Sequence, residues 1–109
     1  MSFSLKNLPE RSAKPRTEGI TLVLDKGYSI RQVEDLVDVC SKHIDIVKLG
    51  WGTSYVTQGL EEKIKVYQNA GIPVYFGGTL FEAYLMRNQL SDYRKLMEHY
   101  EISHLEVSN

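Results

Sequence analysis

Short apolar runs alternate with longer amphipathic segments along this chain. The runs are rich in β-branched and aliphatic residues, which is typical of buried strands. The four expected strands are 20–25, 45–49, 73–76 and 103–107. Between them, apolar residues recur every three or four positions, a pattern that predicts helices. The expected helices cover about 30–43 and 58–70, and two more begin near 80 and 91.

Local signals indicate where these helices begin and end. Ser29 and Gln32 have the spacing of a capping box, in which each residue bonds the backbone of the other, and Thr79 and Glu82 repeat that spacing. Gly71 suits the left-handed position that ends a helix. No comparable signal opens a helix between 50 and 57, so this stretch is expected to be a loop.

The alternation of strands and helices predicts right-handed crossovers and a parallel sheet. The last expected strand has no helix after it, and a parallel strand without one leaves a face uncovered. We therefore expect an α/β fold, a (β/α)₈ TIM barrel, of which the chain covers about the first four strands and three helical crossovers. Residues 1–18 are expected to form an N-terminal arm, and 19–109 the N-terminal half of a truncated barrel.

Four polar or hydroxyl-bearing side chains are expected to share one face of the sheet, namely Asp25, Lys48, Tyr75 and Glu106. Side chains alternate along a strand, and near the ends of strands 45–49 and 103–107 the opposite face is aliphatic, with Val47 and Leu49 in one and Leu105 and Val107 in the other. Active sites of such barrels lie at the carboxyl ends of the strands. Lys48 and Glu106 come from alternate strands, so they could pair in one interior layer. A lysine so placed is a plausible acid, base or anion clamp, and the alternative is an ion pair that only fills the barrel.

Two glycine-rich turns follow expected strands. Gly77-Gly78-Thr79 opens a helix, where successive amides could hold a phosphate or carboxylate; the alternative is an ordinary glycine turn followed by a capping residue. Gly50-Trp51-Gly52-Thr53 could bring backbone close to a ligand with Trp51 as a wall, although a tryptophan in a turn also serves packing.

Composition narrows the classes of protein. The formal net charge of −1 argues against nonspecific binding to nucleic acid or membranes. No apolar run approaches the roughly 20 residues that a membrane helix needs. The single cysteine, Cys40, excludes an internal disulfide framework, so we expect a reduced, cytoplasmic protein. Lys14 and Arg16 are expected to be a solvated basic pair, with anion binding as the alternative.

Four stretches resemble the phosphosulfolactate synthase family in order and spacing. They are KPRTEGITLVLDKG at 14–27, VKLGWGT at 47–53, GIPVYFGGTLFE at 71–82 and LEVSN at 105–109. Members of that family are (β/α)₈ barrels, and this chain is similar to the first half of one. The resemblance implies a magnesium-dependent lyase that adds sulfite to phosphoenolpyruvate, giving (2R)-phospho-3-sulfolactate for coenzyme M synthesis or sulfolactate formation.

On this resemblance and the strand positions together, Lys48 and Glu106 are expected to be catalytic, and Asp25 and Glu106 to hold Mg²⁺. The expected substrate-binding residues are Lys26, Trp51, Thr53, Gly77, Gly78, Thr79 and Ser108. The partners would be the two small substrates, without nucleic acid or membrane, and homo-oligomer formation stays open. A non-catalytic α/β module that binds an anionic metabolite or a partner protein is the rival from another class. Another barrel lyase or aldolase acting on a phosphorylated enol is the nearest rival among enzymes.

Overall fold

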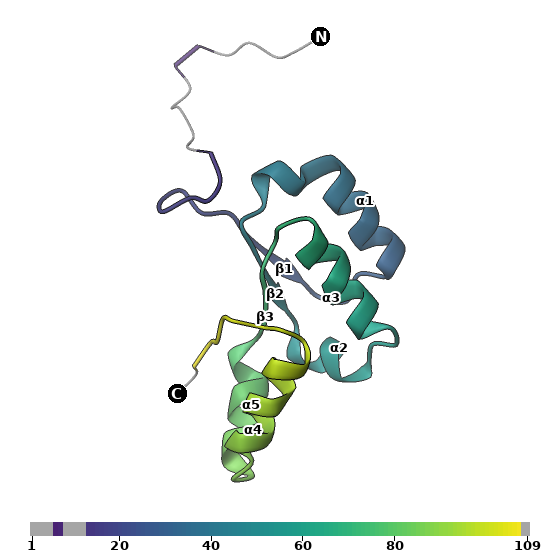
Figure 1. Ribbon diagram of the computed structural model, residues 1–109, viewed down its shortest axis with the longest axis vertical. Coiled ribbons are helices and arrows are strands. Elements are labelled where there is room, and N and C mark those ends of the chain that lie inside the picture. Colours follow the sequence, from purple (N-terminus) through teal and green to yellow (C-terminus); the bar gives the residue numbers. More distant parts are fainter. Residues whose placement is uncertain (1–5, 8–12, 108–109) are drawn as a thin grey trace.

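The computed structural model describes residues 6–7 and 13–107, and of Trp51 and Thr53 it describes the backbone alone. Three strands and their following helices form an α/β unit (Figure 1). The strands are β1 (Leu22–Asp25), β2 (Ile46–Leu49) and β3 (Val74–Phe76). The helices are α1 (Ile30–Cys40), the 3₁₀ turn η1 (Ser41–His43), α2 (Trp51–Val56), α3 (Leu60–Asn69), α4 (Gly78–Met86) and α5 (Leu90–His99).

The three strands are parallel and lie in the order β1-β2-β3. This arrangement confirms the expected α/β class and parallel sheet. Helices α1 and α3 lie side by side against one face of the sheet (Figure 1). Helices α4 and α5 form an antiparallel pair that extends beyond the carboxyl end of β3 (Figure 1). The other face of the sheet carries no helix among the residues that the structure describes.

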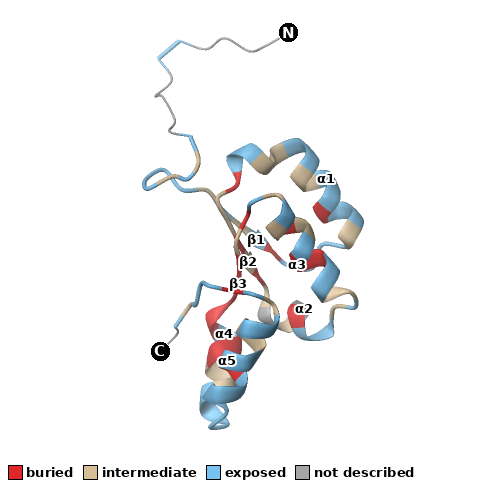
Figure 2. Cartoon of the chain, viewed as in Figure 1, coloured by how far each residue is buried: buried red, intermediate tan, exposed pale blue. Residues whose placement is uncertain are grey.

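The core lies between the sheet and its helices. Buried residues gather along the strands and at the start of α4, whereas most of α1 is exposed (Figure 2). The fully buried apolar side chains from the strands are those that point toward α1 and α3: Val47, Leu49, Val74 and Phe76. Cys40 is partly buried and packs against this core.

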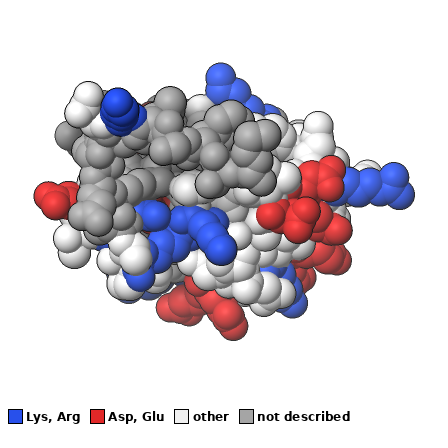
Figure 3. All heavy atoms as spheres, turned by 90° about the horizontal axis from the view of Figure 1, so that it is seen from above, with Lys and Arg blue, Asp and Glu red and all other residues white. Residues whose placement is uncertain are grey.

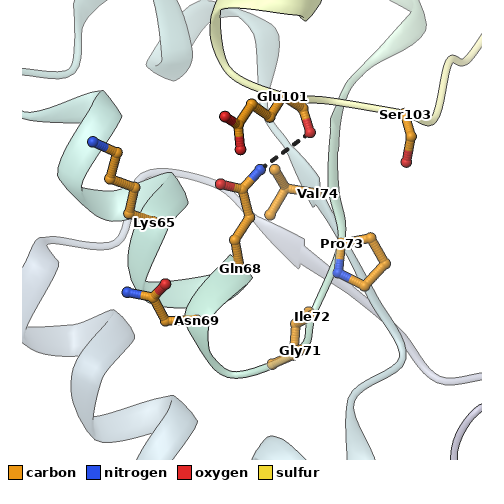
Figure 4. A pocket seen from close by; sticks show the side chains of 9 residues that line it. All are labelled: Lys65, Gln68, Asn69, Gly71, Ile72, Pro73, Val74, Glu101 and Ser103. Carbon is orange, nitrogen blue, oxygen red and sulfur yellow. Dashed lines mark hydrogen bonds between the residues drawn. The ribbon is translucent and has the colours of Figure 1, made fainter.

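The expected fourth strand is absent from 103–107, which the structure describes without regular secondary structure. A hollow of about 520 Å³ lies between the amino end of β3 and residues 101–103 (Figure 4). There the Gln68 amide donates to the carbonyl oxygens of Tyr100 (3.0 Å) and Glu101 (3.4 Å). The chain after α5 is thus held by side-chain contacts to α3 instead of a backbone ladder on β3, and a strand requires that ladder.

Of the two capping boxes expected from the sequence, the structure contains one. The capping box of Ser29 and Gln32 is present, with both reciprocal hydrogen bonds formed. The one expected from Thr79 and Glu82 is wrong, because α4 already begins at Gly78 and Thr79 lies inside its first turn. A helix N-terminus accepts glycine as cap almost as readily as serine or threonine, so spacing alone did not locate it.

Residues 51–56 form α2 and not the expected loop. Gly50 takes an extended conformation and caps the helix, and both the amide and the hydroxyl of Ser54 bond to the Gly50 carbonyl, at 2.9 and 2.7 Å. Because the helix has only six residues, it is too short for an apolar periodicity that a sequence pattern could detect.

The N-terminal arm is attached to the amino end of the sheet. The Arg16 guanidinium, 6% exposed, pairs with Asp45, and the Lys14 ammonium donates to the carbonyl of Ser41 at 2.6 Å. The expectation of a solvated basic pair is therefore wrong. Asp45 supplies the counter-charge for Arg16, and the Ser41 carbonyl accepts the hydrogen bond of Lys14. The local sequence pattern could not reveal these partners, because they lie 29 and 27 residues away.

Charges of both signs are spread over the molecule. Basic and acidic side chains both appear on the face seen in Figure 3 and do not form a region of a single sign. Among the described helices, none combines the length and the apolar character that crossing a membrane requires.

Candidate functional site

The register of the sheet decides which side chains share a face. Leu24, Lys48 and Tyr75 are aligned across the three strands, and all three point away from α1 and α3. Asp25 belongs to the next row, with Leu49 and Phe76, and points toward the helices. The expectation that Asp25 and Lys48 share a face is therefore wrong. It assumed that Leu22 and Leu24 pack on the helices, but these leucines are 49% and 41% exposed.

Lys48 and Glu106 form the expected pair. The Lys48 ammonium lies 3.0 Å from Oε1 and 2.9 Å from Oε2 of Glu106. The backbone amide of Gly78 donates to the same Oε1 at 3.1 Å. A cation from the middle strand and an amide from the first residue of α4 thus converge on one carboxylate. Helix N-termini favour negative charge, so the two donors form a site suited to an anion.

Lys48 and Glu106 are partly open to solvent, with 30% and 34% of their side chains exposed. The Lys48 ammonium lowers the pKa of the Glu106 carboxyl, against a smaller opposing effect of burial and with help from the Gly78 amide. Glu106 is therefore ionised at neutral pH, and it can accept a proton or a hydrogen bond but holds no proton to donate.

Tyr75 lies beside this pair on the same face. Burial, and after it the charge of Glu106, raise the pKa of the Tyr75 hydroxyl, so it stays protonated at neutral pH. A hollow of about 260 Å³ lies next to the pair, lined by Leu22, Ile46, Tyr75, His104, Leu105 and Glu106. The open face of the sheet thus offers a cation, a carboxylate and a phenol around a partly apolar space.

Gly77 lets the Lys48 side chain approach the backbone. A Cβ built on Gly77 would lie 3.1 Å from Cε of Lys48. The Gly77 backbone angles are ordinary for any residue, so the requirement for glycine comes from space and not from conformation. The sequence predicted that the amides of Gly77 and Gly78 bind substrate. In the structure the Gly78 amide donates to the Glu106 carboxylate, and Gly77 lies against the side chain of Lys48.

The remaining expected substrate-binding residues are less closely assembled. Lys26 lies in an exposed turn directly after β1, and Thr79 is exposed in the first turn of α4. Trp51 and Thr53 begin α2, but their side chains lie outside the described part of the chain. Ser108 also lies outside the described residues.

Asp25 has a set of partners that the sequence pattern did not reveal. Its carboxylate is buried on the helix side of the sheet and bonds Lys63 and Tyr67 of α3. Tyr67 lies at an apolar position of the helix expected over 58–70, and Lys63 lies four positions before it, one turn away on the same side of the helix. A buried aspartate requires a buried donor, and that spacing is the one signal that pointed to Lys63.

The donor set does not fit a magnesium site made by Asp25 and Glu106. The two carboxylates lie on opposite faces of the sheet, and Asp25 already accepts four hydrogen bonds. Within 6–7 and 13–107, the structure shows no group of three or more histidine, cysteine or acidic side chains that could hold a metal ion. Glu106 alone remains as a described carboxylate near the anion site.

Comparisons with known proteins all lead to one family. A family model described as (2R)-phospho-3-sulfolactate synthase (ComA) matches residues 9–109. The chain is 39% identical to the phosphosulfolactate synthase of Bacillus subtilis (strain 168) over 107 residues, 98% of this chain and 42% of the relative. The enzyme of the same name from Methanothermobacter thermautotrophicus is 37% identical over 93% of this chain and 40% of its own length.

A third relative, the phosphosulfolactate synthase of Methanocaldococcus jannaschii, is 42% identical over 84% of this chain and 37% of the relative. The chain thus spans about two fifths of the length of these curated relatives. The matched stretches include the residues around Lys48, Gly77, Gly78 and Glu106. Since the family model covers nearly the whole chain, this chain belongs to the (2R)-phospho-3-sulfolactate synthase family.

Proposed function

We propose that the complete protein is a phosphosulfolactate synthase that adds sulfite to phosphoenolpyruvate, giving (2R)-phospho-3-sulfolactate. Family membership supports this activity, and the three relatives carry that name. The observation that carries the proposal is the convergence of the Lys48 ammonium and the Gly78 amide on one carboxylate. Both proposed substrates are anions, and the same two donors suit their charged groups.

In the proposed reaction, the sulfur lone pair of sulfite forms a bond to the methylene carbon of phosphoenolpyruvate. The electrons of the carbon–carbon double bond move toward the carboxylate, and a proton then adds to the carbon that bears the phosphate. Lys48 would stabilise the charge that develops on the carboxylate, because a fixed cation in a partly buried site costs little reorganisation during the reaction. Glu106 is ionised, so we do not propose it as the acid that protonates carbon.

Glu106 would instead orient Lys48 and hold the amide of Gly78 ready for an anion. Its two oxygens engage both donors. Binding of a substrate carboxylate or phosphate would then require Glu106 to share or release one of them. The partial exposure of the pair is consistent with such an exchange, since water can reach it.

Magnesium dependence stays a prediction about the complete protein. Mg²⁺ is commonly bound by one or two carboxylates together with substrate oxygens and water. Glu106 is the single described carboxylate that we would place near it, and no step is derived through the ion. Completion of the sheet to a (β/α)₈ barrel and a cytoplasmic location likewise remain predictions, and homo-oligomer formation stays open.

The proposed activity is tested by incubating the full-length protein with magnesium, sulfite and phosphoenolpyruvate and measuring phosphosulfolactate. Product that requires both substrates supports the proposal. A non-catalytic module would bind phosphoenolpyruvate in a titration and yet form no product with sulfite. Binding without product in the presence of magnesium would therefore overturn the proposed activity in favour of that module.

Replacing Gly77 with alanine is expected to reduce turnover with little loss of stability. The new methyl group would displace Cε of Lys48 by a few tenths of an ångström, and small misplacements of a catalytic group cost about tenfold in kcat. The flexible lysine side chain can move, so we expect the melting temperature to stay within about 3 °C. Turnover and thermal unfolding of the purified variant measure the two effects.

Gly52→Ala is the matched control for this substitution. A Cβ on Gly52 has no neighbour within 4 Å, and the residue lies in α2, where alanine favours the helix. Turnover should be unchanged in this control. Equal turnover in Gly77→Ala and Gly52→Ala would show that the position of Lys48 is not critical.

A further inference from the structure

A buried polar cluster lies on the helix side of the sheet, separate from the anion site. It consists of Asp25, Lys63 and Tyr67, which are 1%, 3% and 0% exposed. Oδ1 of Asp25 accepts a hydrogen bond from the Lys63 ammonium at 2.9 Å, and Oδ2 accepts one from the Tyr67 hydroxyl at 2.7 Å. Nothing in the proposed reaction uses these groups.

Stability alone does not account for the cluster. Replacing a buried ion pair with apolar side chains of similar volume is often neutral or stabilising, because desolvation offsets the attraction of the charges. Polar groups retained in a core therefore point to a requirement for a particular geometry. The remaining hydrogen bonds of Asp25 indicate which geometry that is.

Oδ1 of Asp25 also accepts hydrogen bonds from the backbone amides of Gly27 and Tyr28, at 2.9 and 2.8 Å. These amides belong to the turn that carries Lys26. Gly27 has a φ of 132°, a backbone conformation that glycine adopts readily and other residues rarely do. Because glycine is also free to leave this conformation, hydrogen bonds to its amide act as an external constraint on the turn. The aspartate at the end of β1 supplies that constraint.

The cluster also connects this turn to α3. Lys63 lies in the first turn of α3, and its amide donates to the carbonyl of Gly59 at 3.1 Å. Asp25 therefore bonds side chains from two successive turns of α3. The turn after β1 is held against a helix and cannot move independently of it.

The same turn adjoins the other turns at the carboxyl edge of the sheet. The Gly50 amide donates to the carbonyl of Asp25 at 2.9 Å, and the Gly77 amide donates to the carbonyl of Leu49 at 3.1 Å. The turns after β1, β2 and β3 are thus hydrogen-bonded in series. Lys26 enters this edge from β1, and Lys48 and Gly78 from β2 and β3.

We propose that Asp25, supported by Lys63 and Tyr67, is a positioning residue that fixes the turn carrying Lys26 at the edge where Lys48 and Gly78 bind anions. Lys26 then meets an anionic group of the substrate, and the buried cluster acts on substrate binding from the opposite face of the sheet. The assignment of Lys26 to a substrate group rests on the proposed function. The restraint that Asp25 places on the turn is independent of the proposed function.

Amide hydrogen exchange in the full-length protein tests the hold on the turn. Tyr67→Phe removes one hydroxyl with little change of shape, and Lys63→Met removes the ammonium. We expect exchange at the amides of Gly27 and Tyr28 to accelerate about tenfold in both variants, because their acceptor is no longer fixed. Lys65→Met, which removes an exposed ammonium from the same helix, should leave both rates unchanged. Unchanged exchange in Tyr67→Phe overturns the proposal, even if Lys63→Met fails to fold.

Steady-state kinetics of Tyr67→Phe test the effect on substrate. We expect KM for phosphoenolpyruvate to rise about fivefold while kcat stays within about twofold, because the variant loosens a binding lysine and leaves Lys48 in place. Faster exchange with an unchanged KM would overturn the role of the cluster in positioning Lys26. A wild-type protein without turnover would overturn the proposed function and the substrate assigned to Lys26, whereas the exchange rates would still decide whether Asp25 holds the turn.

Discussion

Replacing Lys48 with alanine is expected to lower kcat of the full-length protein about 10²–10³-fold, the range seen when one preorganised group that stabilises a developing negative charge is removed. The lysine holds its ammonium 2.9 Å from Glu106 at the carboxyl end of the sheet, where the proposed enediolate charge would form. Phosphosulfolactate formation under saturating substrate measures the effect. Folding should be preserved, since the side chain is 30% exposed and fills no core position.

Glu106→Gln and Lys65→Ala complete this experiment. The glutamine keeps the shape of Glu106 but removes the charge that orients Lys48, so turnover should again fall. Lys65, on α3, forms only an exposed pair with Glu61 at 3.5 Å, so its loss should not affect turnover. If Lys48→Ala and Glu106→Gln both stay within about threefold of wild type, roughly 0.7 kcal/mol, neither residue carries the chemistry.

Replacing Asp25 with asparagine is expected to lower the free energy of unfolding by about 3–5 kcal/mol at neutral pH, because it leaves the Lys63 ammonium buried without its counter-charge. Urea unfolding of the full-length protein measures the loss. Asp25→Asn combined with Lys63→Met removes both charges and should recover much of it. A surface replacement, Lys65→Met, should change stability by less than about 1 kcal/mol.

The lowered pKa of Asp25 predicts that the free energy of unfolding depends on pH in the acid range. Burial would raise the pKa of Asp25, but the hydrogen bonds from the Tyr28 amide, Lys63, Tyr67 and the Gly27 amide outweigh burial and leave it below its ordinary value of 3.8. A lowered pKa in the folded state contributes stability above the ordinary value and loses it as the pH falls through the folded pKa.

The difference in unfolding free energy between wild type and Asp25→Asn should therefore stay constant from pH 7 to pH 5. It should shrink once the pH falls below 3.8, the ordinary pKa of an aspartate. Unfolding curves at a series of pH values provide the measurement. A difference that stays the same below that pH would mean that folding does not lower the pKa of Asp25.

The sequence by itself determined the parallel α/β arrangement, because apolar residues at two distinct periods mark strands and helices without reference to the rest of the chain. It also predicted the pairing of Lys48 with Glu106, although Glu106 reaches Lys48 from an irregular segment and not from the expected fourth strand. In β2 the apolar residues Val47 and Leu49 are buried against the helices, so Lys48 must point to the other face.

Only the tertiary structure decided the face of Asp25. In β1 both faces are apolar up to the last residue, with Leu22 and Leu24 on one and Val23 on the other, so alternation alone cannot orient the strand. The register with β2 orients it, and the buried donors of Lys63 and Tyr67 then compensate the carboxylate. Pairing between strands and contacts across about forty residues are set by the packed chain, and a local pattern contains no information on either.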